Sequence, residues 1–98
     1  MPAYLVANIT VTDPKRYPEY REKVPPVIAQ YGGKFLVRGG TVHLVEGNLG
    51  VDRLVVIEFP TMEAARHFYN SSEYEPLLKL RLETARSQVA FVEGYAAS

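Results

Sequence analysis

Two charged residues interrupt apolar, strand-forming segments and are the first candidates for chemistry. Arg38 lies in a predicted strand over residues 34–46, and Glu58 lies in a predicted strand over residues 53–59. If the turn between these strands is near residues 48–49, the two side chains fall roughly opposite one another as a cross-strand ion pair. In the functional alternative, the guanidinium of Arg38 binds a carboxylate or an enolate, and a desolvated Glu58 acts as a general base.

A histidine in the first of these strands is a third candidate for catalysis. A bulge at Gly39–Gly40 could bring His43 to the face that carries Arg38, where a neutral imidazole would be a base, a ligand or a hydrogen-bonded core group. His67 is the other histidine of the chain, and neither histidine belongs to a metal-binding pattern such as HxH or HExxH. We therefore expect no metal site and no cofactor.

Aromatic side chains are abundant, with seven tyrosines, four phenylalanines and no tryptophan. Six tyrosines could line a space between helices and a sheet: Tyr4, Tyr17, Tyr20, Tyr31, Tyr69 and Tyr74. Core packing, with the hydroxyl groups at the rim, would explain them. Alternatively, the space is a flat pocket for an aromatic or quinone-like molecule, with Tyr4, Asn8 and Tyr69 as substrate-binding residues. Asn8 and Arg38 would then orient the oxygens of that molecule.

Composition narrows the classes of function. The 98 residues include eleven basic and eleven acidic side chains and no cysteine. The balanced charge creates no field that would attract nucleic acid or an anionic membrane, and the missing cysteine excludes thiol catalysis and disulfides. No apolar run reaches the length of a membrane span and no secretory leader is recognisable, so we expect one cytoplasmic domain over residues 1–98. Arg66, Arg81 and Arg86 are expected to be solvated or paired on helix surfaces.

Hydrophobic periodicity and turn residues predict the order strand, helix, strand, strand, helix, strand. Strands are predicted at residues 3–11, 34–46, 53–59 and 88–95. The first helix is predicted to begin at an Asp13 N-cap. The Pro25–Pro26 pair is expected to break or kink it near Lys23, because proline removes a backbone donor and clashes with the preceding turn.

A second helical region is predicted over residues 62–69, and a capping box over residues 72–75 starts another helix. Right-handed crossovers turn this order into an α+β, ferredoxin-like βαββαβ fold, in which a four-stranded antiparallel sheet carries the helices on one face. The other face would expose apolar side chains of several strands, which soluble monomers rarely do. We therefore expect a homodimer that packs sheet against sheet, the alternative being a tail or loop that covers this face.

Several segments together resemble a known family. They are GGKFLVRGG at 32–40, the EG pair at 46–47, RLVVIEFP at 53–60, FYNSSEY at 68–74, Arg81, and VEG at 92–94. In these segments the chain resembles the small bacterial family called domain of unknown function 1330. The resemblance implies a dimeric α/β barrel, a superfamily that also contains muconolactone isomerases, cofactor-free antibiotic-biosynthesis monooxygenases and chlorite-dismutase-like proteins. It implies no particular reaction, because a shared fold hosts many activities.

Two functions follow as hypotheses. In the first, the protein is a cofactor-free enzyme, of monooxygenase or isomerase type, for a small aromatic or enolisable compound. Arg38 would stabilise an oxyanion, and Glu58 or His43 would move a proton. In the second, the protein binds a metabolite or acts as an accessory protein without catalysis. Convergence of these three residues on an open cavity would favour the enzyme, whereas a packed Arg38–Glu58 pair would favour a structural role.

Overall fold

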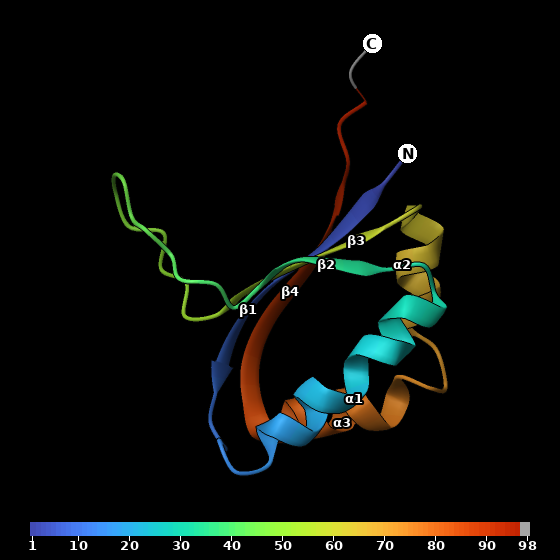
Figure 1. Ribbon diagram of the computed structural model, residues 1–98, viewed down its shortest axis with the longest axis horizontal. Coiled ribbons are helices and arrows are strands. Elements are labelled where there is room, and N and C mark those ends of the chain that lie inside the picture. The colour runs from blue at the N-terminus through green and yellow to red at the C-terminus, as the bar shows by residue number, and fades with distance from the viewer. Residues whose placement is uncertain (97–98) are drawn as a thin grey trace.

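The computed structural model describes residues 1–96, which form one antiparallel sheet with three helices on one of its faces (Figure 1). The strands are β1 (Ala3–Val11), β2 (Lys34–Arg38), β3 (Leu54–Phe59) and β4 (Ala85–Glu93). The helices are α1 (Tyr17–Gln30), α2 (Met62–Tyr69) and α3 (Glu75–Thr84). The strand order β2-β3-β1-β4, with every pair antiparallel, confirms the predicted ferredoxin-like fold.

The central strand β1 organises the core, because it pairs with both β3 and β4. Side chains alternate between the two faces of a strand. On β1 the buried set is Ala3, Leu5, Ala7 and Ile9. Leu5, Ala7 and Ile9 pack in one cluster with buried side chains of all three helices, of which Phe68 on α2 and Ile28 on α1 are almost completely enclosed. The bounds predicted for this strand are confirmed.

Helix α1 runs through the Pro25–Pro26 pair, where a break or a kink was predicted. Neither proline can donate a backbone hydrogen bond, so the carbonyl groups four residues earlier lose their helical partners. One of these carbonyls, on Arg21, instead accepts a hydrogen bond from the guanidinium of Arg38 at the end of β2. A tertiary contact thus replaces part of the lost helical bonding, and the helix does not break at the proline pair.

Short polar side chains set the helix starts, in two cases not at the predicted positions. Asp13 accepts hydrogen bonds from two backbone amides in a turn ahead of α1, which therefore begins only at Tyr17. Thr61 caps α2 by accepting a hydrogen bond of 3.0 Å, as expected at that boundary. The turn before α3 is held by Ser71, which accepts a 3.1 Å bond from a backbone amide, and not by the capping box predicted from Ser72.

Strand β2 ends at Arg38, well short of the predicted end at residue 46. Gly39 has a φ of +70°, and its amide donates a 2.7 Å hydrogen bond to the carbonyl of Leu54, which turns the chain out of the sheet. Residues 40–52 then form an arm that reaches away from the sheet and helices (Figure 1). Strands β2 and β3, which were predicted to be joined by a short turn, are therefore joined by this long arm.

A β-bulge at Leu36 decides the direction of the arginine at the end of β2. The pairing of β2 with β3 shifts by one residue there, so one residue of β2 is left without a partner. Beyond the bulge Arg38 pairs with Val55, whose buried side chain faces the helices. The bulge was predicted at Gly39–Gly40, and this position was wrong. Because the bulge lies before Arg38 in the chain, Arg38 is on the helical face of the sheet.

The opposite face of the sheet has no helix over it among residues 1–96 (Figure 1). A row of apolar side chains crosses all four strands on this face: Val37, Val56, Val6 and Ala90, each paired with the next. These side chains are only half-buried or are exposed. The uncovered face of the sheet therefore carries apolar side chains, as the sequence predicts.

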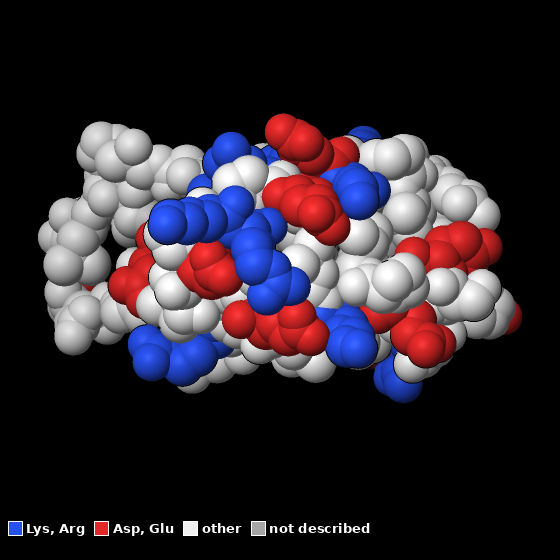
Figure 2. All heavy atoms as spheres, turned by 90° about the horizontal axis from the view of Figure 1, so that it is seen from below, with Lys and Arg blue, Asp and Glu red and all other residues white. Residues whose placement is uncertain are grey.

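Charged side chains of both signs are interspersed on the surface around α1 and α3 (Figure 2). Arg16 forms a 2.8 Å ion pair with Glu83, which links the start of α1 to the end of α3. Lys23 and Glu19 form a second pair, of 3.4 Å, one turn apart on α1. Within residues 1–96 no helix combines the length and apolar character that crossing a bilayer requires.

Candidate functional site

A narrow cavity lies between the helical face of the sheet and the helices. Its walls are apolar side chains of β1, β3 and α1, together with polar side chains that are all arginine or tyrosine. The polar set is Arg21, Arg38, Arg53, Arg81, Tyr17, Tyr20, Tyr69 and Tyr74. The cavity volume is about 40 Å³, enough for about three water molecules. Larger occupants require side chains at its mouth to move.

Arg81 of α3 is buried in the wall of this cavity, with 3% of its surface exposed. Its guanidinium donates hydrogen bonds of 3.3 Å to the hydroxyl of Tyr74 and 3.4 Å to the hydroxyl of Tyr69. Among residues 1–96 it has no carboxylate within ion-pair distance. The expectation that Arg81 is solvated or paired was therefore wrong, and a buried cation lacks its counter-charge.

The guanidinium nevertheless stays charged. Burial by itself lowers the pKa of Arg81, but the phenol oxygens of Tyr74, Tyr20 and Tyr69 outweigh this effect and raise the pKa above the ordinary arginine value. A charged group without a counter-ion is costly to bury. The arrangement therefore favours the entry of an anionic oxygen.

The tyrosines form a connected cluster around Arg81. The hydroxyl groups of Tyr20 and Tyr74 are 2.9 Å apart and share a hydrogen bond. The rings of Tyr69 and Tyr74 lie 5.6 Å apart between centroids, and Phe68 lies 4.4 Å from Tyr74. The cluster therefore combines flat apolar surfaces with hydroxyl groups that can donate to a ligand oxygen.

Burial, followed by the neighbouring Tyr74, raises the pKa of Tyr20 far above the ordinary tyrosine value of 10.0. Above pH 10 the unfolded chain loses this proton while the folded protein keeps it, so the free energy of unfolding falls as the pH rises. Above pH 10, we expect the free energy of unfolding of Tyr20→Phe to fall less steeply with pH than that of the wild type, by about 1.4 kcal/mol per pH unit. Urea unfolding between pH 8 and 11 measures it, and equal slopes in the two proteins would show that Tyr20 ionises freely.

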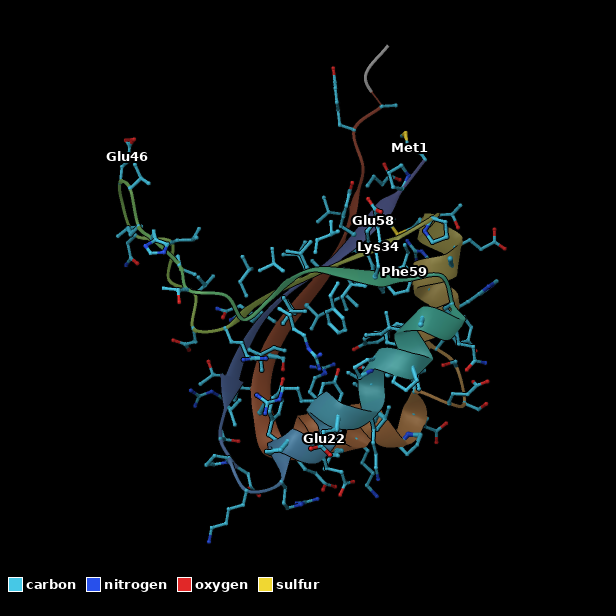
Figure 3. All side chains as sticks on the ribbon, viewed as in Figure 1. Met1, Glu22, Lys34, Glu46, Glu58 and Phe59 are labelled. Carbon is cyan, nitrogen blue, oxygen red and sulfur yellow. The ribbon has the colours of Figure 1, made fainter. Side chains whose placement is uncertain are left out.

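Arg38 reaches the mouth of the cavity, but Glu58 does not. The bulge in β2 places Arg38 on the helical face, with its guanidinium 4.5 Å above the ring of Phe35. Glu58 lies on the opposite face, where it forms a 3.2 Å ion pair with Lys34. Figure 3 shows Glu58 and Lys34 together at one end of the sheet. The predicted Arg38–Glu58 pair is thus replaced by Lys34–Glu58.

Two residues predicted to bind substrate also lie away from the cavity. Tyr4 donates a 3.3 Å hydrogen bond to Glu58 on the uncovered face. Asn8 fastens the base of the arm to β1, since its side chain accepts a 2.9 Å hydrogen bond from the amide of Asp52 and donates one of 3.3 Å to the carbonyl of Gly50. Of the three predicted substrate-binding residues, the structure places only Tyr69 in the cavity wall.

His43 lies on the arm, where every residue from 41 to 50 is exposed. The bulge that was expected to bring His43 beside Arg38 lies upstream of both residues, so the two do not share a site. Within residues 1–96, no group of three or more potential ligands lies close enough to hold a metal ion.

Arg81 is the main site residue that the sequence interpretation missed, and a signal for it existed. The buried residues of α3 are Leu77, Leu80, Arg81 and Thr84, the spacing of one helical face. Leu78 and Leu82 form a second apolar pair at helical spacing, but Leu82 is exposed. An arginine in register with buried leucines would have indicated a functional cation.

The sequence matches the family model of the domain of unknown function DUF1330 over residues 2–95. The chain belongs to this family. The predicted resemblance is thereby confirmed. No significant match among curated proteins accompanies this one.

Solved structures share the fold of this DUF1330 chain at low sequence identity. A Rhodopseudomonas palustris protein of unknown function is 18% identical, with a TM-score of 0.75 over 98% of this chain and 84% of its own. SnoaB, a cofactor-independent oxygenase from Streptomyces nogalater, is 14% identical, with a TM-score of 0.67 over 98% and 95%. A candidate antibiotic biosynthesis monooxygenase from Caulobacter crescentus is 16% identical, with a TM-score of 0.60 over 97% and 91%. These likenesses establish the fold alone.

Proposed function

We propose that the protein is a cofactor-free enzyme, of monooxygenase or isomerase type, that acts on a small aromatic or enolisable compound in the cavity. The observation that carries this proposal is Arg81, a buried cation with no carboxylate partner among residues 1–96, surrounded by tyrosine rings. An enolate or phenolate oxygen supplies the missing negative charge, and the flat rings match an apolar, planar ligand.

The chemistry that this wall can perform is the stabilisation of a developing anion. As a ligand loses its acidic proton, charge gathers on one oxygen, and Arg81 and the hydroxyls of Tyr69 and Tyr74 already point to a common region. Fixed donors of this kind favour the anionic form without having to reorganise during the reaction. The proton passes to water. The resulting electron-rich carbon would then bond to dioxygen in an oxygenase, whereas in an isomerase another carbon of the delocalised anion would take a proton back from water.

Two structural neighbours support the choice of reaction class. SnoaB is described as a cofactor-independent oxygenase, and the Caulobacter crescentus protein as a candidate monooxygenase. A fold alone does not determine an activity, so this support is by analogy, and the charge in the cavity carries the argument.

The alternative is binding without turnover. Every polar group of the cavity wall belongs to an arginine or a tyrosine. At neutral pH these side chains donate hydrogen bonds but do not accept a proton, because they are protonated already. Such a wall holds an anion that forms in solution, which is what a metabolite-binding or accessory protein requires.

Two assays separate these functions. Oxygen uptake with a panel of hydroquinones and phenols reports oxygenation, and loss of α-proton signals in D₂O reports proton exchange in ketones and lactones. If the protein is an enzyme, the rate of oxygen uptake or of proton exchange is higher with the folded protein than with heat-unfolded protein. A compound that raises the melting temperature while neither rate changes indicates the binding protein.

The same proposal includes a homodimer formed through the uncovered sheet face. The apolar row across the sheet would be covered by a second copy, as aligned sheets commonly pack. The arm adds exposed apolar side chains that lie far from their own core, namely Val42, Leu44, Val45 and Leu49. The single-domain boundary at residues 1–98 and the cytoplasmic location stay predictions from the sequence.

We expect light scattering to give about twice the mass of one chain at micromolar concentration. Val56→Arg places a charge in the middle of the apolar row and should yield a folded monomer, because an unpaired charge is costly to bury in an interface. The matched control Leu82→Arg alters an exposed residue of α3 and should stay dimeric. A wild-type monomer, or a dimer unaffected by Val56→Arg, would contradict this interface.

A further inference from the structure

Three arginines converge on the mouth of the cavity from three parts of the chain. Arg21 belongs to α1, Arg38 ends β2, and Arg53 precedes β3, and all three line both the cavity and the wider depression outside it. Figure 3 shows nitrogen-tipped side chains in the space between β2 and α1. Among residues 1–96, Glu22 on α1 is the one carboxylate in this depression, and none of the three arginines has a carboxylate within 4.0 Å.

Arg53 is held at the mouth with one of its hydrogen-bond donors unsatisfied by residues 1–96. Its Nε atom is buried and has no hydrogen-bond partner among the described residues. The guanidinium lies against the backbone of Gly39, where an added Cβ would be 2.5 Å from Nη1 and 2.6 Å from Cζ. Glycine at this position therefore makes room for the arginine, and the fold holds Arg53 in place although no residue within 1–96 satisfies its Nε donor.

Arg38, like Arg53, is held at the mouth of the cavity by contacts with other parts of the chain. One of its Nη groups donates to the carbonyl of Arg21, which Pro25 leaves without a helical partner, and its guanidinium plane lies near the ring of Phe35. Arginine has five N–H donors in a planar fork, so most of them stay free for a ligand. The side chain of Arg38 is exposed at the mouth.

We infer that the ligand of this cavity is a small aromatic or enolisable acid whose carboxylate binds between Arg38 and Arg53. The inference rests on the proposed function and adds to it the charged group that the substrate must carry. The planar fork of arginine matches a carboxylate with two parallel hydrogen bonds. Arg21 adds positive charge beside them, and the apolar part of the acid extends inward to Arg81 and the tyrosines.

Binding of such an acid requires a rearrangement at the mouth. The cavity of about 40 Å³ is below the volumes of 300 Å³ or more that are typical of ligand pockets. The carboxylate would replace the carbonyl of Arg21 as the acceptor for Arg38, which frees the guanidinium to swing outward. Arg38 would thus both close the mouth of the cavity and bind the charged group of the ligand.

Isothermal titration calorimetry with 4-hydroxybenzoate and its neutral counterpart 4-hydroxybenzamide tests this inference. We expect the acid to bind at least about tenfold more tightly, since the two probes differ chiefly in charge. Arg53→Gln and Arg38→Gln should each remove this preference. Arg66→Gln, an equal loss of charge at an exposed position on α2, should retain it. Melting temperatures without ligand verify that each variant is folded, and the exposed Arg38 provides the variant least prone to unfold.

Equal affinity for the acid and the amide would overturn the inference and leave the proposed function standing. Inorganic phosphate binding as tightly as 4-hydroxybenzoate would also overturn it, because the arginines would then attract anions without regard to the apolar part. If the wild-type protein bound neither organic probe at millimolar concentration, the aromatic cavity itself would fail as a binding site, and both proposals would be wrong.

Discussion

Replacement of Arg81 by methionine is expected to reduce ligand binding and turnover by about a hundredfold or more while leaving the protein at least as stable as the wild type. Arg81 is enclosed by tyrosines and has no carboxylate partner among the described residues. Methionine has a similar length and fills such space without a charge. The substitution therefore removes an anion-binding group and a desolvated cation together.

The two effects have opposite directions, and this distinguishes function from structure. A residue kept for stability lowers the melting temperature when it is replaced, by roughly 4–8 °C for each kcal/mol in a domain of this size. Arg81→Met should keep or raise the melting temperature while the response to aromatic ligands disappears. Arg66→Met removes an exposed arginine from α2 and should change neither property. Unchanged ligand binding combined with a fall of several degrees would make Arg81 a structural residue.

Phe68→Ala is expected to lower the free energy of unfolding by about 3–5 kcal/mol, a large share of the roughly 5–15 kcal/mol available to a small domain. The Phe68 side chain is 1% exposed, and its ring centroid lies 5.5 Å from that of Phe59 and 4.4 Å from that of Tyr74. Alanine leaves a hole among aromatic rings that cannot easily close.

Urea unfolding at neutral pH measures this loss. The matched control is Phe91→Ala, since Phe91 on β4 is only half-buried at the edge of the core, with its ring centroid 5.8 Å from that of Tyr69. We expect the control to lose less than half as much stability, because less apolar surface returns to water. Similar losses in the two variants would show that the centre of the core is not at Phe68.

The fold relationships set a limit on what can be carried over from other proteins. The neighbours share the backbone arrangement at 14–18% identity. At that distance the side chains of a site are not shared by default, so activity has to be argued from the groups that line the cavity. In this chain those groups are arginines and tyrosines, which can pair with an anionic group but do not form a set of ligands for a metal cation.

Much of the architecture follows from local patterns in the sequence. The alternation along residues 3–11 determines which side of β1 faces the helices, and Thr61 marks the start of α2. The order of elements then leads to the four-stranded antiparallel sheet, because few connections satisfy the handedness rule. These signals involve residues that are neighbours in the chain, so they are readable before any tertiary contact is known.

The site was decided by contacts between distant parts of the chain. The bulge at Leu36 turns Arg38 toward the helices and away from Glu58, and its position depends on how β2 pairs with β3. The helix α1 continues through Pro25 with a distant arginine on one of the freed carbonyls. Arg81 faces inward because α3 packs with that side against the tyrosines of α1 and α2. An arginine in a helix reads as a surface residue from its own neighbours, and only the packing of other elements around it makes it a buried charge.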